Sequence, residues 1–160
     1  MDKVKYLEQH ERLSCLIRND TDRLKCMESS LDGLRSTLGL QDPALSSSYG
    51  NTVFTGTTEE MNNLSKAIKQ KILLRFRLEK QISSALEQMC LNAEQYELET
   101  QYAGLSRYRF IMHCTMQKAA AALNINRATA YRWLEPAIAL FPMPDQPIDI
   151  DKELSLIQAA

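Results

Sequence analysis

The sequence predicts an all-α protein, in which N-terminal and central long helices with coiled-coil character precede a C-terminal helix-turn-helix. Apolar residues recur at spacings of three and four over much of residues 17–89, which is the period of a helix face. Residues 116–133 then read MQKAAAALNINRATAYRW, where two short helical patterns flank a polar turn. With 160 residues and 44% hydrophobic content, the chain can bury one or two modest cores.

The N-terminal region, residues 1–40, is expected to form an amphipathic helix over residues 3–38. Its apolar seam alternates spacings of three and four with one acidic interruption, and consists of Ile17, Asp20, Leu24, Met27, Leu31, Leu34 and Leu38. A heptad seam of this kind requires a partner helix. The partner can be a second copy of the chain, which would form a homo-oligomer and most simply a dimer, or a later helix of the same chain.

A flexible linker is expected over residues 41–57. The composition changes there to serine, glycine and threonine, with Pro43 near its start. Thr58, followed by two glutamates, then predicts the N-terminus of the next helix, because a capping hydroxyl and acids favour that end of a helix. The linker would therefore separate two long helices.

The central region, residues 58–104, is expected to be helical, with one long helix reaching about Leu91. Its apolar stripe drifts from strict heptads near Lys71 and Arg75, and consists of Met61, Leu64, Ile68, Ile72, Phe76, Leu78, Ile82, Leu86 and Met89. The stripe can cover the first seam or form a simple intrachain core. Asn92 can cap a further helix that ends near Gly104.

Residues 105–141 are predicted to form a helix-turn-helix unit, in which one helix props a second at a fixed angle. Ala120 stands where the helices touch, Asn124 tolerates the left-handed turn conformation, and Asn126 is a preferred N-cap for the second helix. The packing is completed by Leu123, Ile125, Ala130 and Trp133. An ordinary helical hairpin with an alanine-rich packing face is the alternative.

Double-stranded DNA is the predicted ligand of the outward face of this unit. That face holds Asn126, Arg127, Ala128, Tyr131 and Arg132, and the candidate contacts are Lys118, Asn126, Arg127, Thr129, Tyr131 and Arg132. Residues 105–141 contain five Lys or Arg and one acid, a net charge of +4, whereas the whole chain has a net charge of −1. A local excess of this kind attracts phosphate.

The C-terminal region is expected to be an acidic, proline-containing tail over residues 142–160. Pro136 is expected to stop or kink the second helix before it. The last twelve residues, DIDKELSLIQAA, could form a short acidic amphipathic helix that docks on a partner, or could remain mobile. The segment over residues 106–115 could extend the helix-turn-helix scaffold or form an extended connection, and the sequence leaves both open.

Several function classes are disfavoured. The four cysteines are widely separated without a C-x-x-C pair, so that buried free thiols are expected at Cys15, Cys26, Cys90 and Cys114. His10 and His113 are the only histidines, and no catalytic constellation or glycine-rich phosphate loop is evident. We therefore expect no enzyme, metal or cofactor. No apolar run approaches the roughly 20 residues that cross a bilayer, and a cytoplasmic location is expected.

With these residues in view, the chain resembles the late transcriptional regulators of bacteriophages of Gram-positive bacteria, the RinA and ArpU-like group. The matching parts are the central stripe leading to LSRY at residues 105–108, and then AAAALNINRATAYRW at residues 119–133. The resemblance implies a C-terminal unit similar to the promoter-reading region of sigma factors. It also implies a phage or prophage regulator that binds upstream of late or packaging genes and helps host RNA polymerase.

Two other classes remain open. A phage DNA-packaging protein such as a small terminase subunit also joins a helix-turn-helix to oligomerising helices, but generally places the DNA unit first. An oligomeric helical adaptor would leave Arg127 and Arg132 as solvated charges. A ring-shaped oligomer would favour the packaging protein, and a dimer that protects one promoter would favour the regulator.

Overall fold

The computed structural model describes residues 1–37, 48–92 and 97–160, and every regular element within these ranges is a helix. The elements are α1 (Lys3–Thr37), α2 (Ser48–Asn92), α3 (Glu97–Ser106), the π-helical turn η2 (Arg107–Ile111), α4 (Met116–Ala122), α5 (Arg127–Leu140) and α6 (Ile150–Ala159). The predicted all-α class is confirmed.

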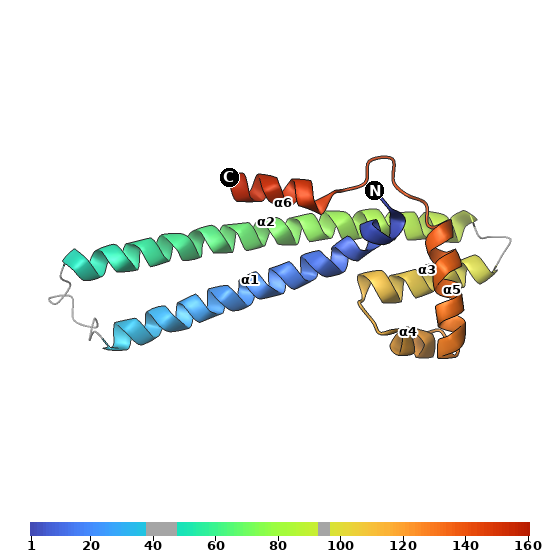
Figure 1. The fold of residues 1–160 in the computed structure, drawn as a ribbon, viewed down its shortest axis with the longest axis horizontal. Helices are drawn as coiled ribbons and strands as arrows, with labels where there is room; N and C mark the ends of the chain where they lie inside the picture. Colours follow the sequence, from blue (N-terminus) through green and yellow to red (C-terminus); the bar gives the residue numbers. More distant parts are fainter. Residues whose placement is uncertain (38–47, 93–96) are drawn as a thin grey trace.

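The helices are arranged around a long antiparallel hairpin of α1 and α2 (Figure 1). The short helices α3, α4 and α5 gather at the end of the hairpin where α1 begins, and α6 lies along α2 (Figure 1). Within the described ranges, no helix has both the length and the apolar composition needed to cross a membrane.

Most of the α1 seam packs within the chain, against α2, whereas Leu34 near the end of the helix is 38% exposed. Ile17 and Leu31 on this seam are 8% and 7% exposed. The acidic interruption also has a partner on α2, because the Lys71 ammonium forms an ion pair with Asp20 and both side chains are mostly covered. The sequence left open whether the seam pairs with a second copy of the chain or with a later helix of the same chain. In the structure, its partner is a later helix of the same chain. Self-association stays a prediction. Because the α1 seam is largely used within the chain, the seam no longer supports it.

The second long helix begins earlier than predicted. α2 starts at Ser48, so the expectation of a linker is wrong for residues 48–57, and Thr58 lies inside the helix instead of capping it. Extending an existing helix is easier than nucleating one, and single glycines such as Gly56 oppose this by only about 1 kcal/mol. The remaining linker residues, 38–47, lie outside the described residues, as does the seam residue Leu38.

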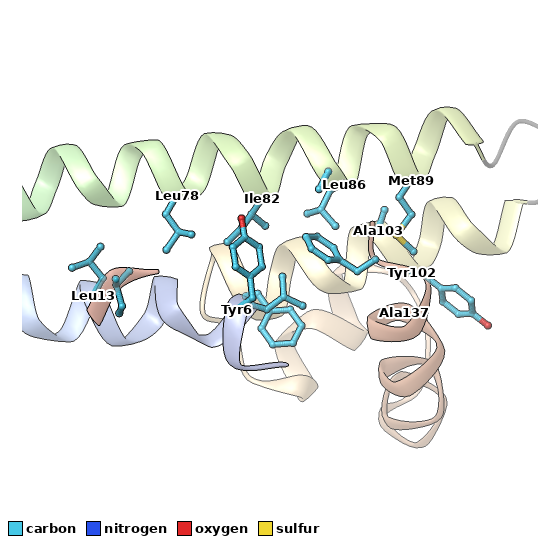
Figure 2. Packing of buried hydrophobic residues seen from close by; sticks show 14 of the residues in the cluster. Tyr6, Leu13, Leu78, Ile82, Leu86, Met89, Tyr102, Ala103 and Ala137 are labelled. Carbon is cyan, nitrogen blue, oxygen red and sulfur yellow. The ribbon is translucent and has the colours of Figure 1, made fainter. Parts of the chain in front are cut away.

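The main core lies at the crowded end of the hairpin (Figure 2). The central stripe supplies much of it through Leu78, Ile82, Leu86 and Met89, which are 0–3% exposed. The other helices contribute Tyr6, Leu7 and Leu13 from α1, Tyr102 and Ala103 from α3, and Ala137 from α5. One stripe residue does not follow the prediction: Phe76 is 55% exposed, and Leu74 is buried instead.

α5 continues through Pro136 to Leu140, so of the stop or kink expected at this proline, the stop is wrong. Proline removes one backbone hydrogen bond, to the carbonyl of Arg132. The residues beyond it bury apolar surface, since Ala137 and Phe141 are both fully buried in the main core. We infer that this burial offsets the lost hydrogen bond.

The C-terminal tail forms the expected amphipathic helix, but it docks on its own chain and not on a partner. The Gln9 side chain donates to the Ile148 carbonyl at 3.0 Å and accepts from the Ile150 amide at 2.9 Å. On α2, the Gln81 carboxamide oxygen accepts from the Ile148 amide at 3.1 Å. Asp149 caps α6, accepting from the backbone N–H of the second residue of that helix. The amphipathic helix is therefore formed, and two glutamines of the hairpin hold the backbone at its start.

Candidate nucleic-acid interface

Two side-chain caps and one left-handed residue define the α4–turn–α5 unit. The Thr115 hydroxyl accepts from the Lys118 backbone N–H at 3.3 Å and begins α4. Asn124 has φ of 55°, the left-handed conformation that ends a helix. The Asn126 side-chain oxygen then accepts from the Thr129 backbone N–H at 2.7 Å and begins α5. The left-handed turn predicted at Asn124 and the N-cap predicted at Asn126 are confirmed.

Small side chains hold α4 close to α5. Ala119, Ala120 and Ala130 are 0%, 3% and 0% exposed, and they form one cluster with Leu105 and Met116. A larger side chain at these positions would push the helices apart. The packing roles predicted for Ala120 and Ala130 are therefore confirmed.

α3 supports the unit from behind. A Cβ atom added at Gly104 would lie 3.1 Å from the Leu123 Cδ2 atom, closer than most Cβ contacts, so glycine allows α3 to approach the turn. Trp133 on α5 meets Tyr102 on α3 edge to face, with ring centroids 5.7 Å apart. Trp133 was predicted to face the core, and in the structure its side chain is half-buried at this contact.

The outward face lies where the sequence predicts it. Asn126, Arg127, Ala128, Tyr131 and Arg132 are all exposed on the first turns of α5. Lys118 is exposed on α4. The predicted contacts therefore come from both helices of the unit.

Side-chain contacts organise this face. The Arg127 guanidinium lies over the Tyr131 ring, 5.5 Å from its centroid, and donates to its hydroxyl at 3.5 Å. Arg132 donates to the Thr129 hydroxyl at 3.2 Å. Thr129 is half-buried and already accepts this hydrogen bond, so in this arrangement it orients Arg132.

The basic groups of the unit differ in their neighbours. Arg109 lies 3.7 Å from the Glu11 carboxylate of α1, which neutralises part of its charge. Among the residues that the structure describes, no carboxylate lies within ion-pair distance of Lys118, Arg127 or Arg132. These three cations remain available to an external anion.

A histidine pair that the sequence did not predict fixes the connection before α4. His10 Nδ1 and His113 Nε2 lie 3.0 Å apart, and the rings stack with centroids 4.9 Å apart. The tautomer in which His113 donates to His10 leaves the His10 Nε2–H facing the Glu79 carboxylate, 3.5 Å away. The two histidines are 103 positions apart in the sequence, so no local pattern could have joined them.

Burial lowers the pKa of both histidines below the ordinary value of 6.5, and it is the largest cause for each. For His10, the neighbouring His113 lowers the pKa further, whereas Glu79 raises it. For His113, Glu11 opposes the effect of burial and Arg109 adds to it. The neutral pair is therefore the favoured state in the folded chain.

Among the described residues, the cysteines form neither a disulfide nor a metal site. All four cysteines are free as predicted, but the expectation that they are buried is wrong, because Cys15 and Cys26 are exposed and Cys90 and Cys114 are half-buried. Cys90 packs against the edge of the main core, and Cys114 lies in the connection between η2 and α4. In the part of the chain that the structure describes, no group of three His, Cys, Asp or Glu side chains could hold a metal ion.

Comparisons with protein-family models, with curated proteins and with solved structures found no match for this chain. The feature with the most specific chemistry is the exposed first half of α5.

Proposed function

We propose that this protein is a sequence-specific binder of double-stranded DNA and acts as a transcriptional regulator. The observation that most supports the proposal is the first half of α5, where Arg127, Tyr131 and Arg132 are exposed together on a helix that is capped and held by α4. In helix-turn-helix proteins, the N-terminal residues of the second helix contact base edges in the major groove.

The chemistry of this face fits base and phosphate recognition. An arginine can donate two hydrogen bonds to one guanine, and a tyrosine hydroxyl can donate and accept. The contact between Arg127 and Tyr131 limits the positions that both side chains adopt. On α4, Lys118 is suited to a phosphate of the backbone. Arg127 would thus contribute specificity, and Lys118 would contribute affinity.

The biological role rests on the family resemblance. A phage or prophage regulator of late or packaging genes, acting in the cytoplasm with host RNA polymerase, is the role that the resemblance supports. The placement of the basic unit after the long helices agrees with this class better than with small terminase subunits. The operator sequence would identify the genes that are controlled.

A binding selection with the purified full chain on random and phage-genome DNA fragments tests the proposal. We expect enrichment of a common sequence that includes a guanine. The triple variant Arg127→Ala/Tyr131→Ala/Arg132→Ala should keep its fold and lose this enrichment. The matched control is Lys5→Ala/Lys25→Ala on α1, which removes the same positive charge from exposed positions and should bind as the wild type does. Unchanged specific binding by the folded triple variant would refute the proposed interface.

Single variants separate specificity from affinity. Arg127→Ala should weaken the preferred site by roughly 1–3 kcal/mol relative to other sequences, as expected for a lost arginine–guanine pair. Lys118→Ala should weaken all sequences alike and reduce the dependence of binding on salt. Competition measurements at several salt concentrations distinguish the two effects, and identical behaviour of both variants would contradict the assigned roles.

A further inference from the structure

An exposed apolar pair lies on the outer face of α2, away from the α4–α5 unit in sequence. Leu73 and Phe76 are 63% and 55% exposed and lie one turn apart. Scattered apolar residues are normal on protein surfaces, but these two lie next to each other on one face of the helix. They do not contribute to the core that fixes α2 in the hairpin.

Lysines flank this pair on both sides. Lys69 lies one turn before Leu73, Lys80 lies one turn after Phe76, and Lys66 lies further toward the N-terminus of the helix. All three lysines are exposed, and none has a carboxylate partner among the residues that the structure describes. We call Lys66, Lys69, Leu73, Phe76 and Lys80 the α2 stripe.

We propose that the α2 stripe is a docking site for an acidic amphipathic helix of another protein. The matching surface has an apolar pair one turn apart, with Asp or Glu on both sides. The distance from Lys69 to Lys80 along the helix is roughly 16 Å at 1.5 Å per residue, so the flanking acids should be about three turns apart. This proposal does not depend on DNA binding by α5.

The chain contains an example of the same recognition. α6 is itself an acidic amphipathic helix that lies along α2. Its Glu153 carboxylate accepts a hydrogen bond from Arg77 at 3.3 Å, while Leu154 and Ile157 pack against the main core. α2 therefore already holds one helix by apolar contacts flanked by a cation–carboxylate pair, and the stripe offers the same combination on an uncovered face.

Charge argues against other occupants of the stripe. A second copy of α2 in parallel would place Lys69 opposite Lys69, and an antiparallel copy centred on the apolar pair would place Lys69 opposite Lys80. Like charges in such positions are repulsive in either orientation. Nucleic acid would satisfy the lysines but leave Leu73 and Phe76 against phosphate. A membrane surface would require a wider apolar face than two side chains provide.

The test is a selection from a displayed library of helical peptides against the full chain. We expect the enriched peptides to combine an apolar pair with acidic flanks. Their affinity should fall at least about tenfold for Leu73→Ser/Phe76→Ser, since apolar anchors at the centre of an interface commonly contribute that much. The matched control, Leu140→Ser/Leu156→Ser, removes two other exposed leucines and should bind as the wild type does.

Charge reversal sharpens the test. A repeated selection against Lys69→Glu/Lys80→Glu should enrich basic flanks in place of acidic ones. Because all substituted side chains are exposed, each variant should retain the thermal midpoint of the wild type. The proposal is overturned if no peptide is enriched, if enriched peptides bind the double-serine variant equally well, or if their flanks are not acidic.

Two further measurements identify the rival occupants. Sedimentation that shows a dimer lost only in Leu73→Ser/Phe76→Ser would assign the stripe to a second copy. Flotation with phosphatidylserine-containing vesicles that is lost only in that variant would assign it to a membrane surface. Either result would overturn the proposal, and neither would affect DNA binding, which is measured separately with the triple variant of α5.

Discussion

The main core of the hairpin and the small cluster beneath α4 and α5 are built from different side chains. The main core joins large residues such as Leu78 and Phe141 from helices far apart in the sequence, whereas the small cluster consists largely of alanines. Trp133 and Leu134 pack against both. Large side chains supply most of the buried apolar surface, and small ones set how closely two helices approach. We infer that the first core provides stability and the second one fixes the orientation of α5.

The polar contacts differ in the same way. At the hairpin end, the Tyr6 hydroxyl donates to the Gln81 side chain at 2.6 Å across 75 positions, and burial raises the pKa of this tyrosine. In the α4–α5 unit, the caps at Thr115 and Asn126 join residues only three positions apart. One region is therefore held together by contacts across the fold and the other by contacts along the chain.

The largest effect is expected from a cavity in the main core. Leu78→Ala removes a fully buried side chain and should lower the free energy of unfolding by about 2–5 kcal/mol. Denaturant unfolding measures it. The control Leu73→Ala changes the same residue type on the exposed face of the same helix and should stay within about 0.5 kcal/mol. If both variants lost the same free energy of unfolding, the difference in burial between Leu78 and Leu73 would be contradicted.

A smaller loss of stability, but a larger loss of function, is expected from the alanine cluster. Ala120→Leu overfills the contact between α4 and α5 and should lower stability by about 1–3 kcal/mol, with weaker DNA binding because α5 is displaced. The adjacent Ala121 is exposed, so Ala121→Leu should leave stability nearly unchanged. If Ala120→Leu abolished binding without any destabilisation, Ala120 would be a DNA contact and not a packing residue.

The histidine pair should make the hairpin end sensitive to acid. The pKa of both histidines is lower in the folded chain than the ordinary value of 6.5, so the unfolded chain binds protons more readily. Stability should therefore fall as the pH falls below about 6.5, and level off below the folded pKa values. Urea unfolding of the wild type and of His10→Gln/His113→Gln over this range measures the effect.

That double variant removes both histidines of the chain, and it should flatten the pH dependence above the range in which carboxylates titrate. An unchanged slope in the variant would assign the acid sensitivity to other groups. DNA binding measured near neutral pH should be the same for the variant and the wild type if the variant is folded, because neither histidine lies on the exposed face of α5.

The smallest effect is expected at the last residue of α3. Ser106 is fully buried, and its hydroxyl has no hydrogen-bond partner among the described residues. Ser106→Ala removes an unpaired polar group and should be neutral or should stabilise the chain by up to about 1 kcal/mol. A thermal midpoint clearly below that of the wild type would show that the hydroxyl is hydrogen-bonded in solution.

The sequence by itself determined the helical class and the details of the α4–turn–α5 unit. The left-handed Asn124, the Asn126 cap and the buried Ala120 and Ala130 follow from rules that relate residues within one or two turns, so they could be predicted locally. The bounds of α1 and the end of α2 also agree with the prediction. The start of α2 at Ser48 does not, because it depends on helix extension and has no strong local signal.

Only the tertiary structure decided what each apolar face and each distant polar group contacts. A heptad seam specifies that a partner helix is required but not which one, and the structure pairs the α1 seam with α2 through contacts such as Asp20 with Lys71. The His10–His113 pair and the docking of α6 on Gln9 join residues more than 100 positions apart. Such contacts depend on how the whole chain folds back. In the unfolded chain, the hydrogen-bonding groups of these side chains bind water, and nothing in the local sequence distinguishes the groups that will later be paired.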